Sequence, residues 1–205
     1  MDAQTNVTST GQKIRTVDIT VTAAMAALVF LGTYIFKIPT ISGYVHLGDC
    51  MILLTVALFG MKKGAIAGAI GGGLSDFIGG YFYWVVPTLL IKCMWAIVMG
   101  LIMHKVLKDK KGSFLIGAIA GGVLHIIAYT LVRVVLYGGK TAIIEIPALA
   151  FQTGAGIVIG FVIYMLLKKI RCSRSSVRYG QIRIRKNVIN EKEPGCQGRI
   201  TWFFL

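Results

Sequence analysis

The stretch that decides the fold is residues 43–102, which read GYVHLGDCMILLTVALFGMKKGAIAGAIGGGLSDFIGGYFYWVVPTLLIKCMWAIVMGLI. It contains three apolar runs, separated only by a basic segment at 61–63 and an aromatic one at 80–84. A helix needs about 20 mostly apolar residues, at about 1.5 Å rise per residue, to cross a bilayer. We therefore interpret this stretch as three consecutive membrane-spanning helices.

Further apolar runs lie on both sides of this stretch. Hydrophobic residues make up 56% of the 205-residue chain, and charged residues only 15%, whereas a soluble domain is about 45–50% apolar. We predict an all-α membrane bundle of six transmembrane helices, at 17–36, 46–61, 64–80, 84–104, 113–136 and 145–167. The domain boundaries follow as a cytoplasmic N-terminal tail (1–15), a membrane domain (16–170) and a basic, disordered cytoplasmic tail (171–205).

The distribution of positive charge predicts the orientation. Of the 22 Lys and Arg residues, eighteen lie before the first span, in the second-to-third and fourth-to-fifth connections, or after the sixth span. Only Lys37 and Lys140 lie on the opposite side, and Lys92 and Arg133 lie within spans. Positive residues favour the cytoplasmic side, so both termini are predicted in the cytoplasm. This pattern accounts for the net charge of +14 without a nucleic-acid partner.

Small residues recur at helical spacing in several spans. Gly64, Gly68 and Gly72 are four residues apart, which lets helix backbones approach closely in lipid. We expect this face to pack inside the protein. Ala23 and Ala27 repeat the spacing in the first span, where either internal packing or docking of a partner fits it.

Ionisable and polar side chains interrupt five of the six predicted spans. A charge at the bilayer centre costs roughly 2.5–3.5 kcal/mol, so such groups need a partner or a hydrated cavity. Each alone fits a structural ion pair or an interfacial position, but all lie in the outer half or near mid-depth. We therefore predict one substrate-binding cavity, open to the outside, formed by His46, Asp49, Asp76, Trp84, Lys92, His125, Tyr129, Arg133, Glu145 and Gln152.

Motifs for catalysis or ATP hydrolysis are not found in the sequence. Gly139-Lys140-Thr141 resembles the end of a phosphate-binding loop, but that pattern needs glycine where Val134 stands. The four cysteines are scattered without a CxxC pair, so no disulfide framework or zinc site is predicted. We predict no enzymatic activity, no cofactor and no metal.

Four segments of the opening stretch carry a family resemblance. They are HLGD at 46–49, FGMKKGAIAG at 59–68, DFIGG at 76–80 and PTLLIK at 87–92. In this order and spacing they resemble the substrate-binding S components of energy-coupling-factor (ECF) vitamin transporters. The resemblance is strongest to the group that includes riboflavin, hydroxymethylpyrimidine and pyridoxine carriers. It covers residues 16–170.

The resemblance implies a multi-pass protein of a bacterial cell membrane. It implies six helices with both termini inside and capture of a vitamin or precursor near the outer face. It also implies docking onto a membrane coupling subunit that two cytoplasmic ATPase subunits drive. In that family an AxxxA face on the first helix contacts the coupling subunit, and Ala23 and Ala27 match it. The tail from residue 171 is longer than is usual in the family.

Two other functions remain open on the residues alone. An autonomous secondary transporter would couple substrate movement to ions through Asp76 or Glu145. A membrane enzyme would hold a metal at His46, Asp49 and Asp76, although their spacing matches no known ligand pattern.

Overall fold

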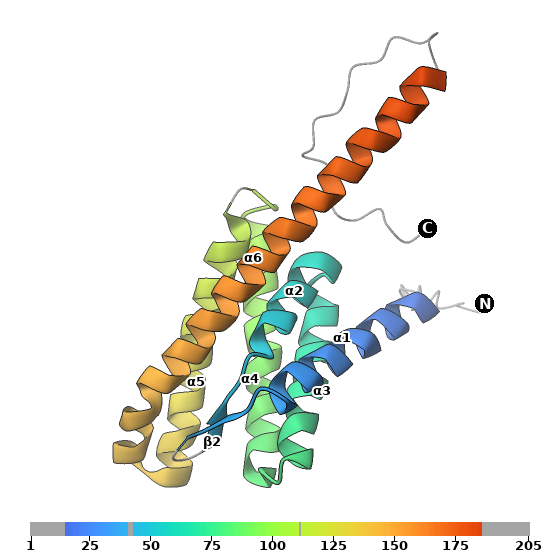
Figure 1. Ribbon diagram of the computed structural model, residues 1–205. Coiled ribbons are helices and arrows are strands. Elements are labelled where there is room, and N and C mark those ends of the chain that lie inside the picture. Colours follow the sequence, from blue (N-terminus) through green and yellow to red (C-terminus); the bar gives the residue numbers. More distant parts are fainter. Residues whose placement is uncertain (1–14, 41–42, 111, 186–205) are drawn as a thin grey trace, which may run out of the picture.

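The computed structural model describes residues 15–40, 43–110 and 112–185. These residues form a helical bundle with one short β-hairpin (Figure 1). A π-helix, Leu101–Val106, extends α4. The helices are α1 (Thr16–Tyr34), α2 (Asp49–Phe59), α3 (Met61–Ile78), α4 (Phe82–Gly100), α5 (Ser113–Tyr137) and α6 (Gly139–Arg185). The predicted helical class is therefore confirmed for the described part of the chain.

Four helical segments of the described residues are long and apolar enough to cross a membrane. They are α1, α4 with its π-helix, α5, and the Gly139–Ile170 part of α6. Helix α2 is apolar but has 11 residues, which span only about 17 Å of a hydrocarbon core roughly 30 Å thick. The span predicted at 46–61 is thus shorter than expected, because residues 43–45 form a strand and Gly60 ends the helix.

The connection between α2 and α3 is a single glycine. The sequence predicted Met61-Lys62-Lys63 as the turn, but these residues form the first turn of α3. Gly60 has φ of +93°, a conformation that residues with a side chain rarely adopt. One residue in this conformation is enough to reverse the chain, so α3 begins at Met61, three residues before the predicted start at 64.

A two-stranded antiparallel hairpin connects α1 to α2, where the sequence predicted only a loop. Strand β1 (Ile38–Thr40) pairs with β2 (Gly43–Val45), with Pro39 opposite Tyr44. Proline has no N–H to donate to a neighbouring strand, so within sheets it is found on edge strands. Both strands of this two-stranded hairpin are edge strands, and Pro39 is therefore tolerated. The hairpin lies at the end of the bundle that holds the α3–α4 and α5–α6 turns (Figure 1).

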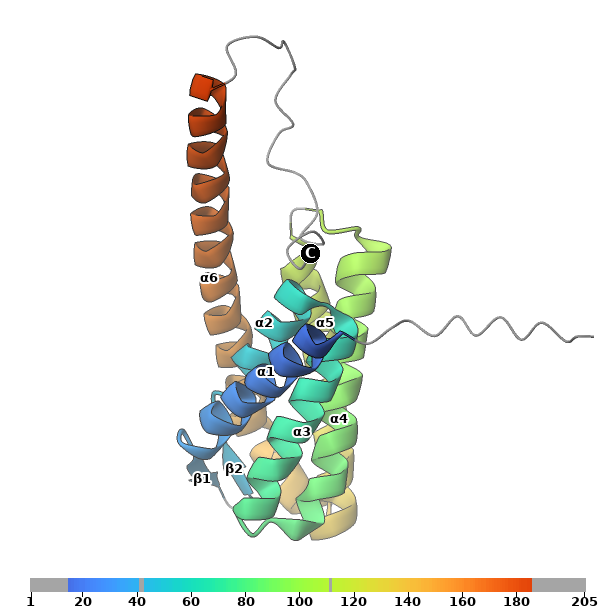
Figure 2. The ribbon, with the colours of Figure 1, turned by 90° about the vertical axis from the view of Figure 1, so that its right-hand side faces the viewer.

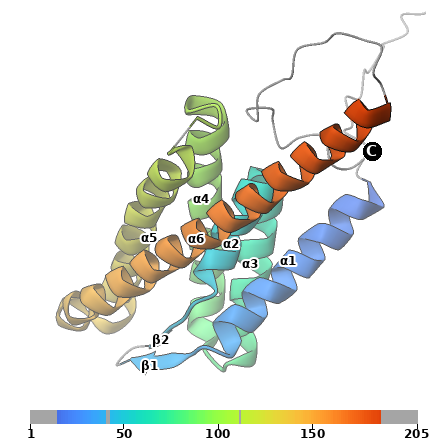
Figure 3. The same cartoon turned by 45° about the horizontal axis from the view of Figure 1, so that its top comes forward.

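Helix α6 is longer at both ends than the predicted span at 145–167. It begins at Gly139, directly after Gly138, whose φ is +85°, and it continues to Arg185. Its C-terminal part extends past the other helices (Figure 1), and Figure 3 shows α6 crossing α2. The sequence predicted disorder from residue 171, but residues 171–185 are helical and contain no proline that would end a helix. Residues 186–205 lie outside the described part of the chain.

Helix α3 is the packing centre of one side of the bundle. Helices α1, α2 and α4 all pack on it, and Figure 2 shows α1 crossing α3 beside α4. The predicted small-residue face is confirmed as internal, since a Cβ at Gly68 would lie 3.0 Å from Ile52 and one at Gly72 would lie 3.0 Å from Thr88. Helix α6 completes the bundle by packing on α2 and α5.

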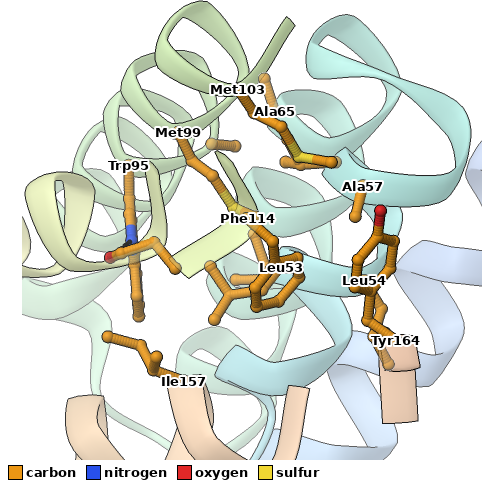
Figure 4. Packing of buried hydrophobic residues seen from close by; sticks show 14 of the residues in the cluster. Leu53, Leu54, Ala57, Ala65, Trp95, Met99, Met103, Phe114, Ile157 and Tyr164 are labelled. Carbon is orange, nitrogen blue, oxygen red and sulfur yellow. Dashed lines mark hydrogen bonds between the residues drawn. The ribbon is translucent and has the colours of Figure 1, made fainter. Parts of the chain in front are cut away.

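The larger of two clusters of buried apolar side chains extends to the end of the bundle opposite the hairpin. Leu53, Met99, Phe114 and Tyr164 meet there from α2, α4, α5 and α6 (Figure 4). Phe114 stacks on Tyr164 with ring centroids 4.9 Å apart. This cluster stabilises the end of the bundle away from the hairpin, and the smaller cluster, with Trp84 and Tyr129, lies nearer the hairpin.

We predict that Gly64→Ala lowers the midpoint of thermal unfolding of the purified protein in detergent. The added Cβ would lie 3.0 Å from the backbone nitrogen of Val56 and closer still to its side chain. Overpacking of this kind costs about 1–3 kcal/mol. The matched control is Gly154→Ala in α6, where nothing lies within 4 Å of the new Cβ. Equal midpoints for the two variants would contradict the packing described here.

Candidate functional site

A cavity of about 40 Å³ lies beneath the hairpin. Side chains from α1, α3, α4, α5 and α6 line it together with residues of the hairpin segment. Six of the ten predicted site residues line it directly, namely His46, Asp76, Trp84, Tyr129, Arg133 and Gln152. All ten are buried in the structure.

Asp49, Lys92 and His125 form a buried network next to the cavity. Lys92 forms an ion pair with Asp49, and these two side chains are 1% and 0% exposed. The Lys92 ammonium also lies 3.2 Å from His125 Nε2. His125 Nδ1 lies 3.1 Å from the hydroxyl of Thr153, whose own proton goes to the Leu149 carbonyl. This pattern assigns the His125 proton to Nδ1 and leaves Nε2 to accept from Lys92.

Gln152 joins this network to the hairpin segment. Its Nε2 donates to Asp49 Oδ2 at 2.7 Å, and its Oε1 accepts from the backbone nitrogen of His46 at 3.2 Å. His46 Nδ1 in turn accepts from the backbone nitrogen of Gly48 at 3.2 Å. The side-chain amide of Gln152 therefore holds the segment that leads from β2 into α2 against the buried ion pair.

The ammonium of Lys37 lies among the rings of three tyrosines, two of which line the cavity. The ammonium of Lys37 lies 4.4 Å from the ring centroid of Tyr44, 4.6 Å from that of Tyr34 and 5.5 Å from that of Tyr81. Such cation–π contacts are favourable. The ammonium also donates to the Ser75 carbonyl at 3.3 Å. Burial lowers the pKa of Lys37, and the nearby charge of Asp76 opposes this shift.

Both strands of the hairpin bind carboxylates of the bundle. The Tyr44 hydroxyl on β2 donates to Asp76 Oδ1 on α3. The Thr40 hydroxyl on β1 donates to Glu145 Oε2 on α6 at 3.4 Å. The hairpin is thereby anchored on two different helices across the cavity.

Arg133 lies between a carboxylate and an aromatic stack. Its Nη2 is 3.0 Å from Glu145 Oε2, and its guanidinium lies 5.6 Å from the Trp84 ring. Trp84 stacks on Tyr129 with centroids 5.6 Å apart and an interplanar angle of 22°, and it donates to the Tyr137 hydroxyl at 3.0 Å. The site thus combines flat aromatic faces with a positive group.

Several polar atoms at the site have no hydrogen-bond partner among the described residues. They include Asp76 Oδ2 and the Nε and Nη1 atoms of Arg133, two side chains that line the cavity. A buried polar group without a partner costs about 1–3 kcal/mol. These atoms are therefore available to hydrogen-bond a ligand.

Several neutral residues line the cavity that the sequence did not predict, whereas Asp49, Lys92, His125 and Glu145 were predicted but lie beside it. Thr33, Gly72, Tyr81, Thr88 and Leu149 also line the cavity. The Tyr129 hydroxyl donates to Thr88 at 2.9 Å. A threonine or glycine in an apolar helix carries no signal of its own.

The three residues of the metal-site alternative have other partners. Asp49 binds Lys92 and Gln152, Asp76 accepts from Tyr44, and His46 Nδ1 accepts from Gly48. Within the described ranges, no group of three or more His, Cys, Asp or Glu residues is arranged to hold a metal ion. The geometry instead presents hydrogen-bonding groups and aromatic faces, which suit an organic ligand.

We predict that Lys92→Met destabilises the protein more than the double variant Asp49→Asn, Lys92→Met. Removal of one partner from a buried ion pair leaves an uncompensated charge and costs about 3–5 kcal/mol. The double variant removes both charges, so its thermal unfolding midpoint in detergent should recover part of the loss. The single variant Asp49→Asn completes the comparison. If the double variant loses as much stability as Asp49→Asn and Lys92→Met lose together, the two side chains do not interact as described.

Comparisons with known proteins identify the family of this chain. The family model described as "ECF-type riboflavin transporter, S component" matches residues 13–169. A protein of Pyrococcus woesei, described as "Uncharacterized protein in gap 3′ region", is 36% identical over 132 residues, which are 64% of this chain and 87% of that protein. The matched range contains all ten predicted site residues and helices α1 to α5. The chain therefore belongs to the ECF-type riboflavin transporter S component family, whose members are multi-pass cell membrane proteins that bind substrate for a transporter.

Proposed function

We propose that this chain captures a water-soluble vitamin or vitamin precursor in the cavity beneath the hairpin. The observation that carries the proposal is the convergence of five helices and the hairpin on one cavity with unpaired buried polar atoms. Trp84 and Tyr129 supply faces for a flat ring, and Asp76 and Arg133 supply hydrogen bonds. Riboflavin is the first ligand to test, because it is the one in the family's description. Pyridoxine and hydroxymethylpyrimidine come next.

We further propose that the hairpin acts as a lid. Pockets for small ligands usually measure about 300–1,000 Å³, whereas the cavity described here measures about 40 Å³. Ligand binding therefore requires the lining to move outward. The hairpin is the segment suited to this movement, because its contacts with Asp76 and Glu145 are side-chain hydrogen bonds that can break and re-form.

The proposed orientation places the hairpin outside the cell and both termini in the cytoplasm. The basic residues Lys62, Lys63 and Lys105 lie at the opposite end of the bundle from the hairpin, as the excess of positive charge on cytoplasmic segments requires. The six helices then alternate in direction across the membrane, although α2 spans only part of its depth. The cavity opens toward the extracellular face in this orientation.

Delivery of the ligand inward requires partners in this proposal. The chain would dock onto a membrane coupling subunit, and two cytoplasmic ATPase subunits would supply the energy. Ala23 and Ala27 on α1 are exposed, so their small side chains can face a partner helix within the bilayer. An autonomous secondary transporter is the alternative, and transport by the chain alone separates the two.

We predict submicromolar binding of riboflavin or another B vitamin to the purified protein by calorimetry. Asp76→Asn and Arg133→Gln should each weaken binding about tenfold or more, since each removes a charged hydrogen-bonding group worth about 1.5–3 kcal/mol. Lys105→Gln is the matched control, because this exposed cation lies at the opposite end of the bundle. The absence of any submicromolar ligand in a panel of B vitamins and precursors would refute the proposed function.

We predict that Ala23→Trp, Ala27→Trp abolishes vitamin uptake by the reconstituted complex but leaves ligand binding within about twofold. Two indoles on this face would block close helix approach without touching the cavity. Ile127→Trp on α5, another exposed position, is the control and should support uptake. Uptake by the chain alone in liposomes would favour the secondary transporter instead.

A further inference from the structure

The charged groups around the cavity compensate one another. Arg133 is paired with Glu145 at 3.0 Å, and Lys92 is paired with Asp49. The ammonium of Lys37 lies over Tyr44, whose hydroxyl binds the third carboxylate, Asp76. Three carboxylates thus balance three cations among the described residues at this site. The cavity has no surplus positive charge to offer an anionic ligand.

The unpaired atoms define which hydrogen bonds a ligand must make. Asp76 is 4% exposed and, as a carboxylate, accepts at Oδ2, while Arg133 is 5% exposed and its Nε and Nη1 can only donate. Both side chains line the same cavity. A ligand that satisfies both must carry a donor at one edge and an acceptor at another. The stacked rings of Trp84 and Tyr129 favour a flat ring between those edges.

We propose that this site selects an uncharged heterocycle and rejects the phosphate ester of the same molecule, and that Glu145 sets this selectivity. The inference rests on the proposed function and adds the charge state of the ligand. A phosphate monoester carries about −1.5 to −2 charge at neutral pH. At Arg133 it would lie beside the Glu145 carboxylate, which already occupies Nη2. Burial of an uncompensated charge is strongly unfavourable.

Glu145 also contacts the lid, which connects selectivity to closure. Its Oε2 accepts both from Arg133 Nη2 and from the Thr40 hydroxyl on β1. A phosphate that drew Arg133 away from Glu145 would therefore disturb the anchor of the hairpin as well. An uncharged acceptor can use Nε and Nη1 and leave the contact with Glu145 intact.

The test compares riboflavin with riboflavin 5′-phosphate, and pyridoxine with its 5′-phosphate, by calorimetry on the purified full-length protein. For the wild-type protein we expect each ester to bind at least tenfold more weakly than its uncharged form. Glu145→Gln removes the compensating charge, so the ratio of the two dissociation constants should fall at least tenfold. Glu145→Asp keeps the charge and is the matched control, and it should keep the ratio.

The outcomes separate this inference from the proposed function. If an ester binds the wild-type protein as tightly as its parent vitamin, the proposed selectivity is wrong. The proposed capture of a vitamin is not contradicted by that result. An unchanged ratio in Glu145→Gln overturns the role of Glu145. If neither vitamins nor esters bind, the proposed function fails and the inference fails with it. The wild-type ratio needs no variant, so the test remains decisive even if Glu145→Gln does not fold.

Discussion

The rest of the site depends on the ion pair between Asp49 and Lys92. Two charges buried in an apolar bundle are stable only when each has a partner and further hydrogen bonds. Gln152 supplies one such bond to Asp49, and His125 lies within hydrogen-bonding distance of the Lys92 ammonium. Because these residues come from α2, α4, α5 and α6, one polar network joins four helices directly below the cavity.

This network lies between two halves of the bundle, an inner half away from the hairpin and an outer half on the hairpin side. On its inner side, apolar residues such as Leu53 and Met99 form a close-packed cluster, and single glycines let α2 and α3 approach each other. On its outer side, the lining is polar and aromatic, and the hairpin closes it through hydrogen bonds rather than through a large apolar contact. If a ligand binds as proposed, the close-packed inner half allows the outer half to adapt to it without loss of the fold.

The sequence predicted the charged residues, whose burial in a membrane is energetically costly, and missed uncharged residues, whose burial is not. Lys92, Arg133 and the carboxylates were recognisable because a charge in an apolar helix demands a partner. Thr33 and Thr88 are tolerated anywhere in such helices, so nothing in the sequence distinguished them. The hairpin was missed because strands of three residues are too short to show alternation. The length of α2 was overestimated because hydropathy does not register the backbone conformation of Gly60.

The two anchors of the hairpin have a kinetic consequence. Tyr44 and Thr40 bind carboxylates on two different helices, α3 and α6, so neither strand of the hairpin can move away from the bundle while both bonds persist. If the hairpin acts as the proposed lid, a ligand bound underneath leaves only after both bonds have opened. Its residence time is then governed by the opening frequency of the hairpin rather than by the strength of any one contact, and tight affinity can arise from slow escape at an ordinary association rate.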